Sequence, residues 1–137
     1  MSNSDNLAKG EPGMMCNELY TRDISASARL FKELFGFVVL REEDGFMALR
    51  TKRAVLLLND GQDLCSEHPF YGKLTGKGHG QCVEIVLAVE NLDTTYQTAR
   101  QFPDCTITPI KLQEWGVRDF RITTKEGFYL RVTEPFE

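Results

Sequence analysis

Polar and charged side chains alternate with apolar ones in two stretches near the C-terminus. The polar positions are Asp119, Arg121, Tyr129 and Arg131, and the apolar positions among them are Phe120, Ile122, Leu130 and Val132. Successive side chains of a strand point to opposite faces, so we expect the polar set on one face and the apolar set in the core. A guanidinium can bind a carboxylate or a phosphate through two parallel hydrogen bonds. The alternation therefore predicts a charged face that suits anions.

The same rule assigns side chains to faces in two further strands. In residues 82–90 the apolar side chains are Val83, Ile85, Leu87 and Val89, which leaves Glu84, Val86 and Ala88 on the opposite face. In residues 15–22 the side chains of Cys16, Glu18 and Tyr20 share a face. Cys16 has no histidine beside it in the sequence, so a nucleophilic role for this thiol lacks an evident base.

Trp115 is the only tryptophan, and it precedes Gly116 at the start of a predicted strand. An exposed aromatic ring in a concave site binds flat molecules well. The alternative is a ring that packs over a sheet edge or at a dimer interface. We predict a pocket or interface position for Trp115. The segment His68-Pro69-Phe70-Tyr71 could close over such a site, although a single loop histidine is more often solvated.

The elements that position these side chains follow from apolar spacing and turn residues. Residues 1–13 are predicted to form a flexible tail. A strand over 15–22 leads into a helix that begins at Asp23, carries an apolar stripe and ends at Gly36. Strands are predicted for 37–40, 46–50 and 54–58. A glycine-rich connecting loop then covers 60–81.

The pattern starts again after this loop. We predict a strand over 82–90, a helix from Asn91 to the residues before Pro103, and strands over 105–112, 116–123 and 128–133. The helix stripe Ile24, Ala28, Phe31 and Leu34, shifted by 68 positions, coincides with Leu92, Tyr96, Ala99 and Phe102. This agreement indicates an internal duplication.

The duplication predicts an α+β fold. Two βαβββ modules would form a curved mixed sheet, shaped as a cup, with the helices on its convex side. One domain is expected over residues 14–137, with module one at 14–59 and module two at 82–135.

Two stretches of the chain carry a family resemblance. The first is DISASARLFKELFGF at 23–37, and the second is WGVRDFRI at 115–122 followed by EGFYLRV at 126–132. They resemble the first helix with its closing LGF, and the WG…F…DPDGN…E ending, of the vicinal oxygen chelate superfamily. That superfamily includes glyoxalases, ring-cleaving dioxygenases, fosfomycin-modifying enzymes and bleomycin-resistance proteins. The resemblance covers about residues 14–135, and it implies the same fold.

The resemblance also implies four inward-pointing metal ligands, usually His, Glu or Gln, from the first and last strand of each module. By position, these are Cys16, Leu57, Glu84 and Arg131 in this chain. Leucine has no donor atom and arginine stays protonated, so the set does not suit a catalytic divalent ion. We therefore predict no metal and no cofactor.

Arg131 is expected to pair with Glu84 in place of the metal. One alternative is a buried pair that only satisfies itself, and another is that Arg131 or Arg121 binds a ligand's carboxylate or phosphate. Glu18 together with Glu84 is the remaining possibility for weak metal binding.

Composition excludes several classes of function. The formal net charge is −4, and no run of Lys and Arg offers a surface for nucleic acid. No apolar stretch approaches the ~20 residues that span a bilayer. The N-terminus lacks the pattern of a signal peptide, and no CxxC pair occurs, so we expect a cytoplasmic protein with reduced thiols.

The leading prediction is a metal-independent protein of this superfamily that binds a small antibiotic-like or anionic molecule and forms a homodimer. The predicted ligand-binding residues are Cys16, Glu18, Tyr20, Leu57, Glu84, Trp115, Asp119, Arg121, Tyr129 and Arg131. One alternative is a lyase, isomerase or dioxygenase with a non-standard active site, whose catalytic residues the sequence does not identify. Another is a structural or regulatory dimer without a small ligand.

Overall fold

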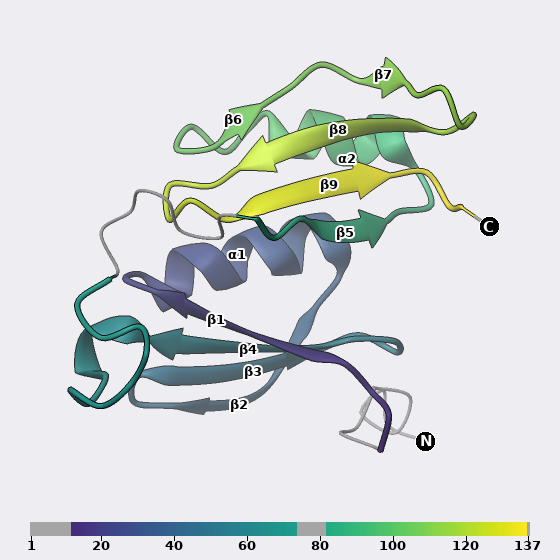
Figure 1. Ribbon diagram of the computed structural model, residues 1–137. Coiled ribbons are helices and arrows are strands. Elements are labelled where there is room, and N and C mark those ends of the chain that lie inside the picture. Colours follow the sequence, from purple (N-terminus) through teal and green to yellow (C-terminus); the bar gives the residue numbers. More distant parts are fainter. Residues whose placement is uncertain (1–11, 74–81, 137) are drawn as a thin grey trace. The chain divides into compact units, whose positions relative to one another are not determined.

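The structure, a computed structural model, describes residues 12–73 and 82–136 (Figure 1). The chain divides into two compact units, and the division falls between residues 74 and 75. Each unit contains one small mixed sheet and one helix of at least two turns, which makes the fold α+β, as predicted. Residues 1–11 of the predicted tail and 74–81 of the predicted connecting loop lie outside the described residues.

The first unit contains a four-stranded sheet. In chain order its elements are β1 (Cys16–Thr21), α1 (Ile24–Phe35), β2 (Val38–Glu43), β3 (Phe46–Arg50), β4 (Val55–Asp60) and a single 3₁₀ turn (Gly61–Asp63). The strand order across the sheet is β1-β4-β3-β2. β1 pairs with β4 in parallel, and the other pairs are antiparallel.

Helix α1 begins and ends at the predicted residues. The Asp23 side chain accepts a hydrogen bond from the Ala26 N–H at 3.0 Å, which satisfies a backbone donor of the first turn. Gly36 follows the helix with φ 72°, a left-handed conformation that glycine adopts without steric cost. The Thr21 and Ser27 hydroxyls lie 2.9 Å apart, so α1 covers the face of the sheet that carries Thr21.

The second unit contains a five-stranded sheet. Its elements are β5 (Ile85–Ala88), α2 (Leu92–Ala99), β6 (Thr106–Ile107), β7 (Lys111–Leu112), β8 (Arg118–Thr123) and β9 (Tyr129–Thr133). The order is β5-β9-β8-β6, and β7 also pairs with β8. The strand predicted for 105–112 is therefore two short strands. Pro109 lies between them and has no N–H to donate to the sheet.

Helix α2 is shorter than predicted. Asn91 caps its start by accepting a hydrogen bond from the Thr94 N–H at 3.0 Å, but the helix ends at Ala99 and not at Phe102. A residue that precedes proline is disfavoured in the helical conformation, which explains the exclusion of Phe102 before Pro103. The Tyr96 ring packs edge-on against Phe120 of β8 at 5.2 Å, so α2 covers the face that carries Phe120 (Figure 1).

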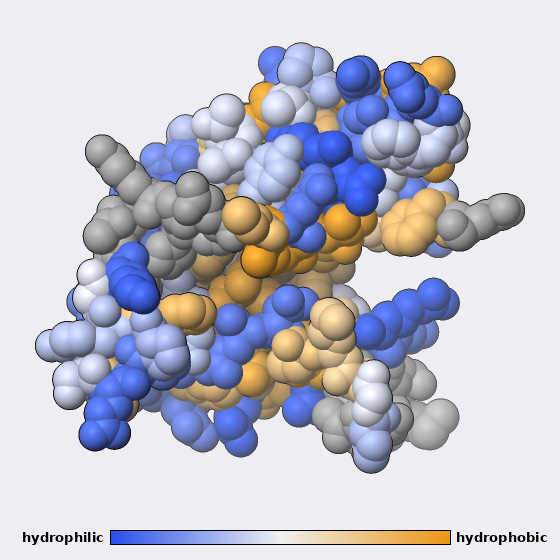
Figure 2. Space-filling view, in the orientation of Figure 1, coloured by the Kyte–Doolittle hydropathy of each residue, from blue (hydrophilic) through white to orange (hydrophobic). Residues whose placement is uncertain are grey.

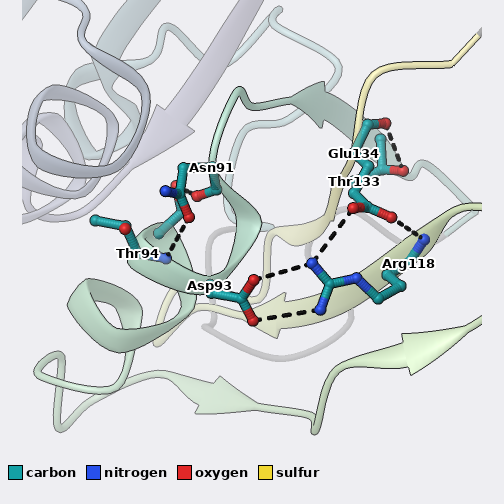
Figure 3. Close-up of polar contacts among 7 residues, drawn as sticks. Asn91, Asp93, Thr94, Arg118, Thr133 and Glu134 are labelled. Carbon is teal, nitrogen blue, oxygen red and sulfur yellow. Dashed lines mark hydrogen bonds and ion pairs between the residues drawn. The ribbon is translucent and has the colours of Figure 1, made fainter.

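Arg118 connects the start of α2 with the end of β9. Its guanidinium donates hydrogen bonds to both carboxylate oxygens of Asp93, at 3.3 and 2.9 Å, and to Glu134 at 3.3 Å (Figure 3). Its backbone N–H donates to the other Glu134 oxygen at 2.7 Å. These contacts join three parts of the second unit on the side of α2. Neither α1 nor α2 has the length and apolar character of a membrane span.

Candidate functional site

A charged face occupies the second sheet on the side away from α2. Arg121 of β8 lies directly opposite Arg131 of β9, and Asp119 lies opposite Thr133. Phe120 and Ile122 point to the other face, where both are almost fully buried. The predicted alternation is thus confirmed for these strands. Figure 2 shows hydrophilic side chains over β8 and β9 on this face.

Glu84 lies between the two arginines. Its Oε1 atom is 3.1 Å from Nε of Arg121 and 3.4 Å from Nε of Arg131. The predicted contact of Glu84 with Arg131 is therefore present, and Arg121 joins it. Like charges directly opposite each other across a sheet repel, and the carboxylate between them offsets this repulsion. We call Glu84, Asp119, Arg121, Tyr129 and Arg131 the arginine cluster.

The Arg121 guanidinium contacts three side chains of the cluster. Besides Glu84, its Nε donates to the Tyr129 hydroxyl at 3.1 Å, and its Nη1 lies 3.1 Å from Oδ2 of Asp119. Burial lowers the pKa of this guanidinium, but the contacts with Asp119, Tyr129 and Glu84 outweigh burial and raise the pKa overall. Arg121 is a cation held by one hydrogen bond and two ion pairs, and its Nη1 is buried without a hydrogen bond.

Asp119 is the buried carboxylate of the cluster, with a side chain that is 2% exposed. Its Oδ1 accepts a hydrogen bond from the Gln113 side-chain amide at 2.8 Å. Its Oδ2 faces Arg121 Nη1 at an angle that does not form a hydrogen bond. Gln113 is absent from the predicted site residues. It lies between β7 and β8, where no period in the sequence assigns a face.

Arg131 is held much less firmly than Arg121. Among the described residues its guanidinium contacts only Glu84, through Nε, and this Nε is buried without a hydrogen bond. The Arg131 side chain is 24% exposed. Both Nη groups of Arg131 therefore have no bond to a described residue and are available to a ligand.

A cavity of about 480 Å³ lies beside the cluster, within the range of small-molecule sites. It is lined by Thr108, Pro109, Ile110, Lys111, Gln113, Asp119 and Arg121. All these residues belong to the second unit, around β7, β8 and the segment between β6 and β7. The lining combines two cations with apolar surface, which suits an anion that has an apolar part.

Trp115 lies apart from the cluster. It is at the turn between β7 and β8, where the Gly116 N–H donates to the Gln113 carbonyl at 3.0 Å and Gly116 has φ 92°. The ring is 59% exposed and makes no ring contact with another described aromatic residue. An exposed indole at a turn is available to a flat molecule, but the turn does not place it in the lining of the cavity.

The other predicted residues lie in the first unit. Cys16, Glu18 and Tyr20 share the face of β1 opposite to Thr21, and Glu18 pairs with Leu57 of β4. The Asn59 side-chain amide donates to Glu18 at 3.2 Å. Asn59 is missing from the prediction, although it follows Leu57 at the period of a strand.

His68 packs against the same face of the first sheet. Its Nε2 is 3.2 Å from the Tyr20 hydroxyl, and its Nδ1 accepts a hydrogen bond from the Phe70 N–H at 3.0 Å. The Tyr20 ring contacts both His68 and Phe70, with centroids 5.1 and 5.2 Å apart. Burial, followed by the charge of Glu18, raises the pKa of Tyr20. The segment after β4 is thus fixed on β1 by aromatic and polar contacts.

The residues at the family's ligand positions do not fit a divalent metal ion. Glu84 is engaged by two guanidiniums at 3.1 and 3.4 Å, and Arg131 is itself a cation. Leu57 has no donor atom, and burial followed by the charge of Glu18 raises the pKa of the Cys16 thiol, which opposes the thiolate that metals bind. Over residues 12–73 and 82–136, no three His, Cys, Asp or Glu side chains come together as a metal site.

The fold and the site define a class of protein. It is a small α+β protein in which two arginines and two carboxylates lie together on one sheet. The chain belongs to the Glyoxalase/Bleomycin resistance protein/Dioxygenase superfamily, whose family model matches residues 14–132. This confirms the resemblance stated from the sequence. No curated protein matches the chain.

Solved structures show the same fold. A glyoxalase/bleomycin resistance protein/dioxygenase family enzyme from Burkholderia phytofirmans PsJN is 15% identical, with a TM-score of 0.70 over 88% of this chain and 96% of that chain. A bleomycin-binding protein complexed with bleomycin is 20% identical, with a TM-score of 0.63 over 90% and 98%. The fosfomycin resistance protein FosX from Mesorhizobium loti is 9% identical, with a TM-score of 0.67 over 93% and 95%. At these identities the likeness establishes the fold.

Proposed function

We propose that this chain is a metal-independent binding protein for a small anionic molecule with a planar or apolar part. The observation that carries the proposal is Arg131. Nε of this guanidinium forms an ion pair with Glu84 at 3.4 Å without a hydrogen bond, and both Nη groups have no bond to a described residue. A guanidinium that is oriented in this way can bind a carboxylate or a phosphate through two hydrogen bonds at little further entropic cost.

The two arginines take different roles in this proposal. Arg121 already contacts Glu84, Asp119 and Tyr129, so it acts as a fixed positive charge beside the cavity. Arg131 contacts Glu84 alone and binds the ligand directly. Glu84 acts as a positioning residue, because one of its oxygens orients both guanidiniums.

The charges of the cluster and the cavity favour an anion. Glu84 and Asp119 balance Arg121 and Arg131, and Lys111 adds a further positive charge in the cavity lining. Pro109 and Ile110 offer apolar surface there. Trp115 is the proposed stacking residue of the second unit. Cys16, Glu18, Tyr20 and Leu57 lie in the first unit and are the proposed ligand-binding residues of that unit.

The comparisons support a binding role at the level of the fold. A protein of this fold binds bleomycin, and another carries the name of a fosfomycin resistance protein. One fold hosts many functions, so the ligand class comes from the residues of this chain. These residues suit an anion held by arginine, and they replace the ligands that a metal-dependent reaction needs.

The test compares a planar anion with its neutral analogue. The affinities of 2-naphthoate and 2-naphthamide are measured by isothermal titration calorimetry for the wild type and for Arg131→Gln. The wild type should prefer naphthoate, and the variant should lose that preference. Arg53→Gln removes one exposed positive charge outside the site and should keep it. Equal affinity for both probes in the wild type, or no naphthoate binding below about 1 mM, would contradict the proposal.

A separate measurement tests whether the protein is independent of metal. Elemental analysis of the protein purified without chelator should find no stoichiometric Ni, Zn, Fe or Mn. One bound ion per chain would contradict this part of the proposal and favour a lyase, isomerase or dioxygenase with a non-standard site.

The assembly and location are also part of the proposal. We infer a homodimer in the cytoplasm that binds neither nucleic acid nor membrane, as the family resemblance and the acidic charge suggest. Sedimentation equilibrium tests the dimer, and a mass of one chain at all concentrations would contradict it.

A further inference from the structure

In the first unit, Arg50 is a guanidinium without a carboxylate partner. It is the last residue of β3 and is partly buried, and its Nε is buried without a hydrogen bond. Among the described residues it forms no ion pair. Burial of a charged group without a partner is unfavourable, so binding of an anion from outside the protein would stabilise such a group.

The register of the sheet explains why Arg50 lacks a partner. Arg50 lies opposite Val38 of β2 on one side and opposite Val55 of β4 on the other. Neither valine can balance the charge. Both cross-strand neighbours are apolar, so the surroundings of the guanidinium favour an anion that has an apolar body.

The nearby carboxylates on this face already have partners. Glu18 accepts a hydrogen bond from Asn59 at 3.2 Å, and Glu43 is paired with Arg41 at 3.2 Å. These contacts keep both carboxylates directed to other residues. Among the described residues, neither carboxylate forms an ion pair with Arg50.

Cys16, Val55, Arg50 and Val38 are successive cross-strand neighbours, and we call these four residues the row across the first sheet. Cys16 pairs with Val55 from β1, while Arg50 pairs with Val55 from β3, so the three residues share one face. The thiol is exposed. The charge of Arg50 acts on it by lowering the pKa of Cys16, against the larger effects of burial and Glu18. Cys16 is thus within electrostatic reach of Arg50 and can report on what binds there.

We propose that Arg50 is an anion-recognition residue of the first unit, and that it binds a small carboxylate with an apolar body in the row that Cys16 shares. The planar carboxylate matches the guanidinium through two hydrogen bonds, and the exposed Val38 contacts the apolar body. This inference does not rest on the arginine cluster. It involves other residues, and either site can be present without the other.

Alkylation of Cys16 tests the inference locally. The thiolate attacks the methylene carbon of iodoacetate or of iodoacetamide, the S–C bond forms, and iodide leaves. Both reagents need the same thiolate, so the ratio of their rates cancels the effect of the thiol pKa. The ratio then reports how strongly the surroundings attract the carboxylate of iodoacetate.

The full-length chain is alkylated and quenched, and the rate at each cysteine is followed by mass spectrometry of the peptides after digestion. The iodoacetate-to-iodoacetamide ratio at Cys16 should fall by roughly tenfold in Arg50→Gln relative to the wild type, while the ratios at the exposed Cys65 and Cys82 stay the same. Lys32→Gln removes an exposed positive charge on α1, on the other face of the first unit, and should leave the Cys16 ratio unchanged. An equal ratio at Cys16 in the wild type and in Arg50→Gln would overturn the inference.

A second measurement uses the wild type alone, in case Arg50→Gln does not fold. Benzoate should slow the reaction of iodoacetamide with Cys16 and not with Cys65, while neutral benzamide should slow neither. Protection of Cys16 by benzoate alone supports the site. No protection, or equal protection by benzamide, overturns it.

Discussion

Arg121 and Arg131 lie directly opposite each other on neighbouring antiparallel strands, and a single oxygen of Glu84 contacts Nε of both. Two like charges at opposed positions would repel each other across the sheet. The carboxylate reduces this repulsion and turns both guanidiniums toward one point. We propose that this relationship makes Glu84 a structural and positioning residue, at a position where the family resemblance implies a metal ligand.

The first prediction concerns the stability of Glu84→Gln. Loss of the carboxylate leaves the two arginines unbalanced, so the free energy of unfolding should fall by about 1 kcal/mol at low salt. At about 1 M NaCl the repulsion is screened and the loss should shrink. Urea denaturation measures both values. Glu33→Gln, which breaks the exposed pair with Arg29, is the control and should change little. A loss that is independent of salt would argue against the repulsion.

The second prediction concerns the buried carboxylate. Asp119→Ala leaves Arg121 Nη1 without its partner and should lower the free energy of unfolding by about 2–3 kcal/mol. Gln113→Ala should cost about 1 kcal/mol, because Asp119 Oδ1 loses its donor. The double variant should cost less than the sum of the two, since both changes remove the same hydrogen bond. Strict additivity in urea denaturation would count against this contact.

The third prediction concerns acid stability. The hydrogen bonds from Arg118 lower the pKa values of Asp93 and Glu134 in the folded state. Their stabilising effect is therefore present above the carboxyl pKa values of the unfolded chain, and it is lost as the pH falls through the lower folded values. Arg118→Gln should make the urea midpoint less dependent on pH between about pH 7 and pH 3. Arg53→Gln should behave as the wild type does. Parallel pH curves for Arg118→Gln and the wild type would refute the effect.

The fourth prediction concerns the segment that contains His68. Its Nδ1 accepts a hydrogen bond from the Phe70 N–H, and His68→Phe removes this acceptor. The hydrogen-exchange protection factor of the Phe70 amide should therefore be lower in His68→Phe than in the wild type. The Tyr71 amide donates to the backbone carbonyl of His68 and serves as an internal control. The same protection factor at Phe70 in both proteins would show that His68 does not hold this turn.

Much of the fold was predictable because local chemistry decides it. The cap at Asp23 and the left-handed residue Gly36 set the bounds of α1, and the alternation in β8 and β9 separates the core from the charged face. The split at Pro109 was less predictable. A proline at a sheet edge is tolerated, so its effect on the strand depends on the pairing with β8.

The missing parts of the site depend on tertiary contacts. The residues of β3 from Phe46 to Leu49 are all apolar, so no alternation assigns a face to Arg50. Only the register with β4 places Arg50 in the row of Cys16. The contact of His68 with Tyr20 likewise joins residues that are far apart in the sequence. The residue types alone indicate candidate binding residues, and the register of the strands shows which of these residues lie next to each other.

The central claim is that the second unit binds its ligand through arginine and not through a metal held by Glu84. The most direct measurement is the affinity of Glu84→Gln for 2-naphthoate by isothermal titration calorimetry, at a temperature where the variant is folded. Glutamine keeps an oxygen that can orient the two guanidiniums but removes the negative charge that competes with the ligand, so the account predicts a lower dissociation constant than in the wild type. Loss of naphthoate binding in Glu84→Gln, as expected for removal of a metal ligand, would contradict it.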